Sequence, residues 1–303
     1  MTNAIETYGL TRRFGRLEAV NGLTVQVPAG SVFALIGPNG AGKTTTIKLL
    51  MNLVRPSGGR ATVLGTDSRR LGVREFQRIG YVSENQKLPD WMTPGELFDY
   101  CQPMYPAWDD GFRARLQREL NLASNAPLRK LSRGMRMKAA LLASLAYRPE
   151  LVVLDEPFTG LDPLVRDELI RALLELPDDR PRTVFISSHD VDEVERLADW
   201  VGFLSEGRLL FAEPVASLQA RFRMFEVIAG NGDAPVLPDR ADWLLQGRAG
   251  RTLRFVATQH AAPGAPALLA SAFAGAEVRE SPMALREIFV TLARALPRAE
   301  ARP

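Results

Sequence analysis

Cysteine and long apolar runs are both scarce in this sequence. The 303 residues include one cysteine, Cys101, so an internal disulfide and a thiolate metal site are excluded. The best apolar stretch, residues 139–147, ends at Arg148, well short of the ~20 residues that span a bilayer. The opening residues MTNAIETYG do not follow the basic-then-apolar pattern of a signal segment. These absences favour a protein that stays in the cytosol.

A strong charge of one sign is absent as well. The chain has 38 Lys and Arg against 35 Asp and Glu, a net charge of +3, and its basic residues are scattered. This balance gives no positive evidence for a nucleic-acid partner. With 46% apolar and 24% charged residues, the composition is typical of a globular protein with one large core and a smaller domain.

The most informative stretch is GPNGAGKTT, which follows an apolar run, residues 32–36, and precedes a helix-competent run, residues 46–53. Glycines permit a tight backbone path, and the start of the following helix offers free N–H groups to an anion. The ammonium group of Lys43 and the hydroxyl of Thr44 suit phosphate and Mg²⁺. The pattern predicts a site for a nucleoside triphosphate and Mg²⁺, formed by Gly37, Pro38, Asn39, Gly40, Ala41, Gly42, Lys43, Thr44 and Thr45.

Two carboxylates follow another apolar run. Residues 151–154, LVVL, have the length of a buried strand and are followed by Asp155 and Glu156. An isolated acidic pair at a strand end is usually a solvated turn. Beside a phosphate loop, however, Asp155 could support Mg²⁺ and Glu156 could polarise the attacking water.

Polar residues also follow two other strand-like runs. His189 comes after residues 183–187, where its imidazole could bond to a γ-phosphate. Glu84 comes after residues 79–82 and is a candidate ligand for a metal ion or water; a solvated loop carboxylate remains the open alternative. The carboxyl ends of parallel strands meet at one edge of a sheet, so these side chains are expected near the phosphate loop.

Helix starts and one aromatic residue complete the candidates. Ser132 can cap an apolar-faced helix that runs to about Tyr147, and this start is either ordinary or a second anion site. Asp162 can cap a helix that begins at Pro163 and runs through Leu176. Phe14, on a turn, could stack on an adenine ring or simply pack.

The motifs GPNGAGKTT, LSRGM, LVVLDEP, GLD and SSH, in this order, resemble the ATP-binding subunit of ABC transporters over residues 1 to about 213. The resemblance implies an α/β P-loop NTPase fold: a RecA-like parallel sheet core with an antiparallel β layer. A helical subdomain is expected at about 89–147. Residues 214–303 are expected to form a small C-terminal α+β domain.

The same resemblance implies roles for the candidate residues. Phe14 matches the aromatic residue that stacks on adenine, Asp155 the magnesium-supporting aspartate, Glu156 the general base and His189 the γ-phosphate switch. Ser132 and Gly134 match the signature motif, which touches ATP held by a second copy or a related subunit. The expected nucleotide-binding residues are Phe14, 37–45, Glu84, Ser132, Gly134, Asp155 and Asp162, and the expected metal ligands are Thr44, Glu84 and Asp155.

The sequence departs from the usual family pattern at two places. Glu84 stands where glutamine is usual, and the signature LSGGQ is changed by Arg133 and Met135. Arg133 could strengthen the closed dimer beside the partner's γ-phosphate, or it could face solvent. Glu84 and the tail MALREIFVTLAR resemble the subgroup whose permeases are separate ABC-2-type proteins, which favours a bacterial exporter.

The expected function is therefore an ATPase that drives a separate membrane permease and is held by it on the inner face of the cell membrane, without a nucleic-acid partner. We expect a permease helix to dock at residues 89–105, on the aromatic residues Trp91, Phe98, Tyr100 and Tyr105.

Three alternatives were weighed against this function. The first is a soluble ABC ATPase that acts on nucleic acid or ribosomes, which usually has tandem ATPase domains or basic insertions not seen here. A GTPase or small-molecule kinase is disfavoured because there is no NKxD motif. A regulator without turnover is disfavoured because Glu156 and His189 are retained.

Overall fold

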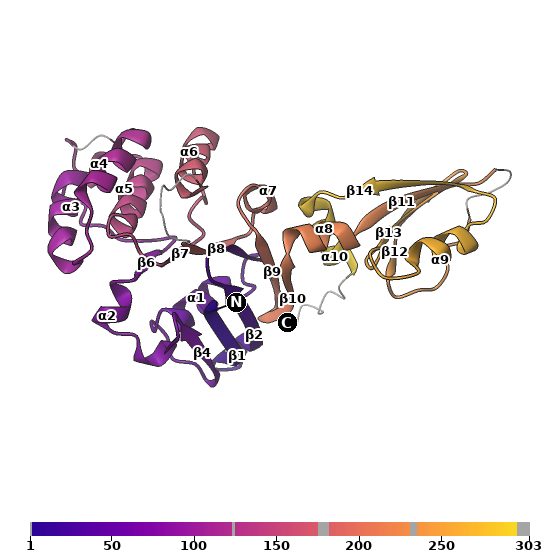
Figure 1. The fold of residues 1–303 in the computed structure, drawn as a ribbon, viewed down its shortest axis with the longest axis horizontal. Helices are drawn as coiled ribbons and strands as arrows, with labels where there is room; N and C mark the ends of the chain where they lie inside the picture. Colours follow the sequence, from indigo (N-terminus) through magenta and orange to yellow (C-terminus); the bar gives the residue numbers. More distant parts are fainter. Residues whose placement is uncertain (1, 123–124, 175–181, 231–234, 296–303) are drawn as a thin grey trace. The chain divides into compact units, whose positions relative to one another are not determined.

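The computed structural model describes residues 2–122, 125–174, 182–230 and 235–295. It divides the chain into two compact units, Met1–Ala212 and Glu213–Pro303. Figure 1 shows the elements of both.

An antiparallel sheet forms one layer of the first unit. Its order is β2-β1-β4-β5, and its strands are β1 (Asn3–Phe14), β2 (Leu17–Pro28), β4 (Gly58–Val63) and β5 (Thr66–Asp67). The sequence pattern predicts short strands from Ala4 to Val27, whereas the structure has two strands of 12 residues each. Leu23, Val25 and Val27 alternate with exposed residues, so one face of β2 is buried in the core.

The second layer is a six-stranded sheet in the order β10-β9-β3-β8-β7-β6. Its strands are β3 (Val32–Ile36), β6 (Ile79–Val82), β7 (Leu151–Asp155), β8 (Thr183–Ser188), β9 (Trp200–Ser205) and β10 (Arg208–Pro214). Strands β9, β3, β8, β7 and β6 pair in parallel, so their carboxyl ends lie at one edge. The register pairs Asp155 with Ser187 and Ile36 with Ser188, which brings the predicted site residues together.

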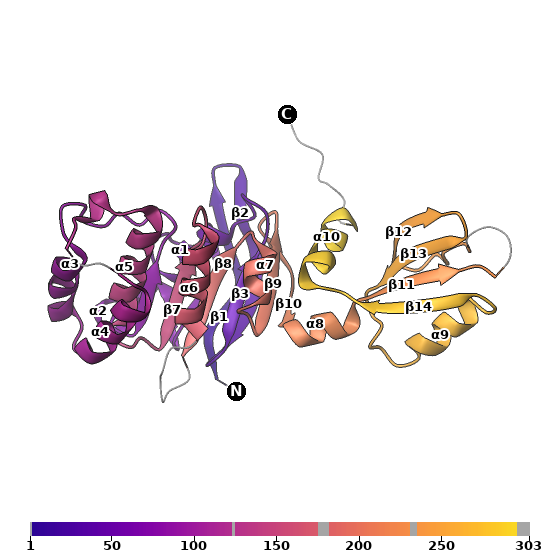
Figure 2. The same cartoon turned by 90° about the horizontal axis from the view of Figure 1, so that it is seen from above.

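Helices α1 (Lys43–Leu50), α2 (Val73–Phe76), α6 (Pro163–Leu174) and α7 (Val191–Glu195) follow strands of this unit (Figure 2). The first begins three residues earlier than the run 46–53 suggests. The sequence pattern also predicts a helix around residues 71–77, but α2 has only four residues, because Gly72, two residues after the 3₁₀ turn η1 (Ser68–Arg70), is extended. The predicted end of α6 at Leu176 falls outside the described residues.

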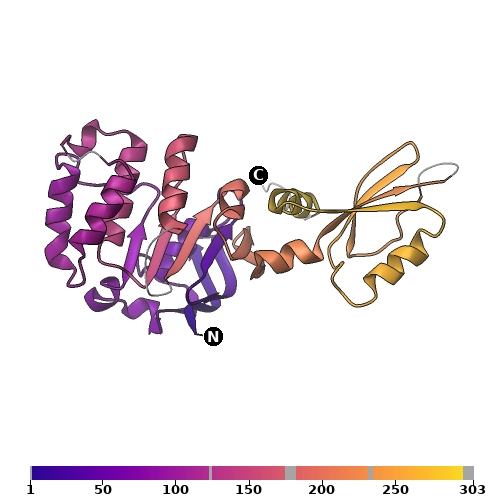
Figure 3. The same ribbon diagram turned by 45° about the horizontal axis from the view of Figure 1, so that its top comes forward.

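The helical segment contains α3 (Pro94–Cys101), α4 (Asp110–Glu119) and α5 (Arg133–Leu145), which lie together in Figures 1 and 3. Two 3₁₀ turns, η2 (Gln102–Met104) and η3 (Leu128–Lys130), lie between them. The start of α3 has a capping box, which the spacing of Thr93 and Glu96 in the sequence predicts. Thr93 Oγ1 accepts from Glu96 N at 3.2 Å, and Glu96 Oε2 accepts from Thr93 N at 2.8 Å.

The predicted docking surface needs a correction in this segment. Phe98 is 1% exposed, because α3 turns it into the core of the helical segment. Tyr105 stacks on Tyr147 with ring centroids 3.8 Å apart. Trp91 and Tyr100 remain exposed, at 63% and 55%. Of the four aromatic residues named for docking, Trp91 and Tyr100 are therefore the two that can offer a surface to a partner.

The second unit is an α+β structure with a four-stranded antiparallel sheet in the order β12-β13-β11-β14. Its elements are α8 (Val215–Arg221), β11 (Arg223–Ile228), β12 (Trp243–Ala249), β13 (Thr252–Ala257), α9 (Ala265–Ala272), β14 (Glu277–Pro282) and α10 (Leu285–Ala295). Strand β12 and helix α8 were not predicted. An aromatic core of Phe225, Trp243, Phe255 and Phe273 stabilises this sheet against α9.

Candidate functional site

The predicted phosphate loop connects the end of β3 to the start of α1. Pro38, Asn39 and Gly40 form its exposed tip, whereas Gly37, Ala41 and Lys43 are buried. Glycine is required at two positions for lack of space: a Cβ at Gly37 would overlap the Leu204 carbonyl oxygen, and one at Gly42 would overlap that of Ala19. The sequence therefore folds into a tight loop whose backbone N–H groups precede a helix, as an anion site requires.

Lys43 lies inside this loop rather than in solvent. Its Nζ donates to the carbonyl oxygens of Gly37 at 2.7 Å and Pro38 at 3.2 Å. The same Nζ lies 3.1 Å from Glu156 Oε1, and both side chains are buried. The ammonium group is thus held inside the loop and paired with Glu156, the carboxylate that directly follows β7.

Asp155, the last residue of β7, lies between the phosphate loop and β8. Its Oδ1 accepts from Thr44 Oγ1 at 3.1 Å and from Ser187 Oγ at 2.7 Å. Burial raises the pKa of the Asp155 carboxyl, although these two hydrogen bonds act in the opposite direction. A carboxylate and a hydroxyl side by side are the oxygen donors that Mg²⁺ prefers.

Glu156 is the most fully engaged side chain of the site. Besides the ion pair with Lys43, its Oε2 lies 2.7 Å from His189 Nδ1 and accepts from Thr159 Oγ1 at 3.1 Å. Burial acts to raise the pKa of Glu156, but the hydrogen bond with His189 and the charge of Lys43 outweigh it, so this pKa is lowered. Glu156 also has a φ of +50°, which is uncommon outside glycine and occurs often at functional sites.

His189 follows β8, and its side chain is partly open to solvent. A carboxylate can only accept, so Nδ1 must carry the proton in the contact with Glu156, which leaves Nε2 available to another group. The loop around it is fixed by Ser188, whose Oγ donates to Glu193 Oε2 at 3.0 Å and accepts from Asp190 N at 2.9 Å. The imidazole is therefore presented from an anchored turn.

The start of α5 forms a separate candidate surface. Ser132 is exposed and caps the helix, since its Oγ accepts from Met135 N at 3.2 Å. Gly134 is buried against α6, where a Cβ would lie 2.8 Å from Val165 Cγ1. Among the described residues, no hydrogen bond joins Ser132 or Gly134 to the phosphate loop. Asp162 caps α6, with its Oδ1 accepting from Val165 N at 3.0 Å.

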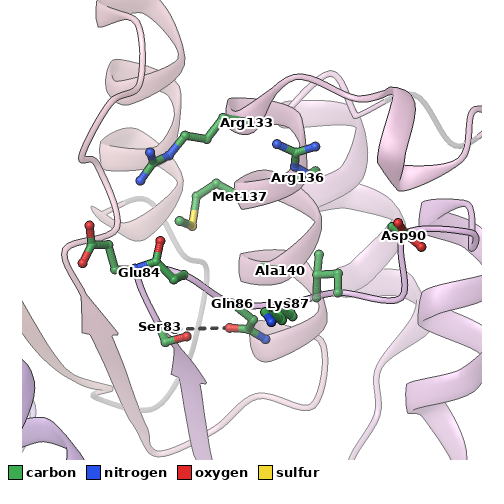
Figure 4. A pocket seen from close by; sticks show the side chains of 11 residues that line it. Ser83, Glu84, Gln86, Lys87, Asp90, Arg133, Arg136, Met137 and Ala140 are labelled. Atoms are coloured by element: carbon green, nitrogen blue, oxygen red, sulfur yellow. Dashed lines mark hydrogen bonds between the residues drawn. The ribbon is translucent and has the colours of Figure 1, made fainter.

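Phe14 and Glu84 are not joined to this centre by any hydrogen bond or ion pair within the described ranges. Phe14 is exposed at the end of β1, and the guanidinium of Arg12 lies 4.3 Å from its ring centroid. Glu84 lines a pocket of about 650 Å³ between α5 and the segment after β6 (Figure 4). Their predicted roles, in adenine stacking and metal binding, stay predictions.

The sequence analysis did not identify two residues that form hydrogen bonds with Asp155 and Glu156. Ser187 donates to Asp155 and also accepts from the backbone N–H of Glu156 at 3.0 Å. Thr159 donates to Glu156 from the turn that follows it. The sequence did contain a signal for each. Ser187 is a small hydroxyl residue near the end of the neighbouring parallel strand, and Thr159 is a hydroxyl residue three positions after Glu156.

The described part of the chain contains no cluster of three or more His, Cys, Asp or Glu side chains arranged for a metal ion. Any Mg²⁺ would depend on the one carboxylate and one hydroxyl described above. In the same residues, no helix has the length and apolar character needed to cross a bilayer.

A phosphate loop, a strand-end Asp–Glu pair and a following histidine, all at the carboxyl edge of one parallel sheet, define a P-loop ATPase, and the predicted fold class is confirmed. Residues 20–159 match the family model described as ABC transporter. The chain belongs to the family of ABC transporter ATP-binding proteins, and its identification as an ATPase rests on that membership.

The similarity extends well beyond the matched residues. An ABC transporter ATP-binding protein of Synechocystis sp. is 33% identical, over 78% of this chain and 70% of the relative. The bacitracin transport ATP-binding protein BcrA of Enterococcus faecalis is 30% identical, over 78% of this chain and 79% of the relative. A solved structure of the ATP-binding subunit of an ABC transporter aligns with a TM-score of 0.65 and 26% identity, covering 72% of this chain and 92% of that one.

Proposed function

We propose that this chain uses Mg²⁺ and ATP at the ends of β3, β7 and β8, closes head to tail on a second ATPase subunit, and thereby drives export through a separate permease. The observation that carries this proposal is the position of Glu156, which bonds to Lys43, His189 and Thr159 beside the Asp155–Thr44 pair. In this position Glu156 contacts both Lys43 and His189, and Asp155 beside it contacts Thr44.

The loop from Gly37 to Gly42 and the start of α1 hold the triphosphate of ATP in this proposal. The backbone N–H groups and Lys43 supply positive charge where the phosphates lie. Thr44 and Asp155 hold Mg²⁺, for which their oxygen atoms are suitable donors. When bound, Mg²⁺ neutralises charge on the phosphate oxygens of the nucleotide.

Glu156 acts as the general base for water. In the described structure Lys43 lies between the Gly37 carbonyl and Glu156, so a phosphate that attracts Lys43 also competes with this ion pair. Loosening the pair frees one carboxylate oxygen, Oε1, to accept from a water molecule. His189 keeps the other oxygen, Oε2, in place and offers Nε2 towards the substrate side.

A second subunit supplies the groups that this site does not contain. Ser132 is exposed at the N-terminus of a 13-residue helix, where free N–H groups and the helix dipole favour an anion. Gly134 lets that helix start lie close to α6. We place Ser132 against the ATP of the partner, which is either a second copy of this chain or a related subunit.

The permease is the third component of the proposal. It would dock on the exposed rings of Trp91 and Tyr100 and hold the ATPase at the inner face of the cell membrane. Export as the direction is supported by the resemblance of Glu84 and the C-terminal helix to exporter subunits, together with the similarity to a bacitracin transport protein.

The catalytic assignment is tested with two variants of the full chain. Glu156→Gln is expected to retain ATP binding and to lose roughly 10²- to 10⁴-fold in turnover, the range for loss of a general base. Lys43→Ala is expected to lose ATP binding itself. ATP affinity is measured by equilibrium titration and turnover by phosphate release. Near-normal hydrolysis by Glu156→Gln would show that another group activates the water.

A further inference from the structure

Arg133, at the start of α5, reaches the loop after β7. Its Nη1, Cζ and Nε atoms lie 3.1, 3.4 and 3.7 Å from the position that a Cβ on Gly160 would occupy. The Nη1 end of the guanidinium group is therefore the part of Arg133 nearest to Gly160, and it fills the space that a side chain at residue 160 would need. That residue has a φ of +70°, so glycine suits both the conformation and the close approach.

The backbones of α5 and α6 hold this contact in place. Gly134, the residue after Arg133, lies so close to Val165 that a Cβ would come within 2.8 Å of its Cγ1. Asp162 caps the start of α6 two residues after Gly160. The start of α5, the turn at Gly160 and the start of α6 are thus packed as one group.

The same turn binds the catalytic carboxylate from its other side. Thr159, next to Gly160, donates its hydroxyl to Glu156 Oε2 at 3.1 Å, and its N–H donates to the Glu156 carbonyl at 3.3 Å. A displacement of the turn at Gly160 therefore moves a hydrogen-bond donor of Glu156. The path from Arg133 to Glu156 has only these two links.

Arg133 also differs from the other arginine nearby. Arg136 lies about one turn further along α5 and lines the same pocket, and Figure 4 shows its guanidinium group apart from that of Arg133. Within the described parts of the chain, no carboxylate forms an ion pair with Arg133. Its contact with Gly160 is therefore one of shape and packing, for which a planar guanidinium is suited and a lysine ammonium is not.

We infer that Arg133 is a positioning residue for ATP hydrolysis, which holds the Thr159–Gly160 turn so that Thr159 orients Glu156. This inference rests on the proposed role of Glu156 as the base. It also gives the altered signature motif LSRGM a function within its own subunit, in place of a direct contact with the partner's γ-phosphate.

A double-mutant cycle tests this path, with Arg133→Gln in one arm and Thr159→Val in the other. Valine keeps the approximate shape of threonine but cannot donate to Glu156. Arg133→Gln alone is expected to lower kcat by roughly two- to thirtyfold, the range for residues that act through a packed network, with KM for ATP unchanged. In the Thr159→Val background the same change is expected to have little further effect.

Two further variants separate packing from charge. Arg133→Lys keeps the charge and is expected to lose nearly as much turnover as Arg133→Gln, because an ammonium group does not fill the space beside Gly160 that the guanidinium occupies. Arg136→Gln, on the same helix and lining the same pocket, is the matched control and is expected to retain wild-type kcat. Thermal unfolding of each variant checks that the fold is intact.

Other results overturn the inference. Additive losses in the cycle would show that Arg133 acts independently of Thr159, and full rescue by lysine would show that its charge acts on the partner's nucleotide. Unchanged kcat in Arg133→Gln would show that it has no role. If instead the proposed role of Glu156 as the base is wrong, the result is different: the Glu156→Gln variant would then hydrolyse ATP at the wild-type rate.

Discussion

The carboxyl edge of the parallel sheet and the start of α5 both offer groups to an anion, but they differ in how far the chain itself satisfies those groups. At the sheet edge, the side chains of Lys43 and Glu156 are 5% and 8% exposed and bond to each other. At the start of α5, Ser132 is exposed, and the one hydrogen bond of its hydroxyl among the described residues is the helix cap. The chain's own contacts therefore occupy the side chains of the first region, whereas Ser132 in the second stays open to solvent, which is why we place the partner's nucleotide there.

The largest effect on this comparison is expected from a charge placed at Ser132. Ser132→Asp keeps the helix cap, because aspartate caps as well as serine, but sets a negative charge against the partner's phosphates. Like charges in an interface cost several kcal/mol, so ATP-dependent dimerisation should weaken by roughly 10²-fold or more. Ser132→Asn, a neutral cap, is the matched control.

Dimerisation is measured by size-exclusion chromatography in a Glu156→Gln background, where ATP is bound but slowly hydrolysed. ATP affinity of the isolated subunit should be the same in both variants, since the phosphate loop is unchanged. A Ser132→Asp protein that still dimerises with ATP would remove Ser132 from the composite site.

The next largest effect concerns the other exposed surface of the helical segment. Trp91→Ala with Tyr100→Ala is expected to weaken binding of the permease by roughly thirtyfold or more, as for an interfacial hot spot, and to leave basal ATPase activity intact. Co-purification with membranes that contain the permease measures this binding. Phe98→Ala is the contrast, because a buried phenylalanine costs about 3–5 kcal/mol of unfolding free energy when truncated. Retained co-purification in the double variant would exclude this surface.

The sequence predicted the sheet edge well because local signals marked it. An apolar strand followed directly by a glycine loop, an Asp–Glu pair or a histidine can be recognised without knowledge of long-range contacts. Parallel topology then brings those strand ends together, as the pairing of Asp155 with Ser187 shows. The grouping of Lys43, Asp155, Glu156 and His189 followed from this rule.

What the sequence could not supply was the direction of individual side chains. Phe98 and Trp91 are both aromatic residues near the start of α3, yet only packing against the helical segment decides that one is buried and the other exposed. The contact of Arg133 with Gly160 depends on the closeness of two helix starts that are 29 residues apart, Arg133 and Asp162. Strand β12 was missed because its pattern includes Gln246 and Gly247 at a register shift.

The smallest expected effect is a difference between Asp155 and Glu156, the two carboxylates at the sheet edge, in how each changes the stability of the fold. Burial raises the pKa of Asp155, whereas the His189 hydrogen bond and the Lys43 charge, which outweigh burial, lower that of Glu156. Because the pKa of Glu156 is lower in the folded protein than its ordinary value of 4.5, ionised Glu156 stabilises the fold at pH values above 4.5. This stability is lost as the pH falls through the folded pKa. The raised pKa of Asp155 has the opposite effect. Asp155 lowers the free energy of unfolding as the pH rises from 3.8 through the pKa of Asp155 in the folded protein.

Opposite stability changes are therefore expected from two isosteric substitutions. Asp155→Asn should raise the unfolding free energy of the nucleotide-free protein at neutral pH, because both hydrogen bonds to Oδ1 can be kept by the amide oxygen while the buried charge is removed. Glu156→Gln should lower it by roughly 1–3 kcal/mol, since Lys43 loses a charged partner. Both differences should shrink at low pH as the wild-type carboxyls take up protons: that of Asp155→Asn between its raised folded pKa and 3.8, and that of Glu156→Gln below 4.5. Denaturant unfolding at several pH values measures them, and a loss of stability in Asp155→Asn at neutral pH would show that its charge supports the fold and not only the nucleotide.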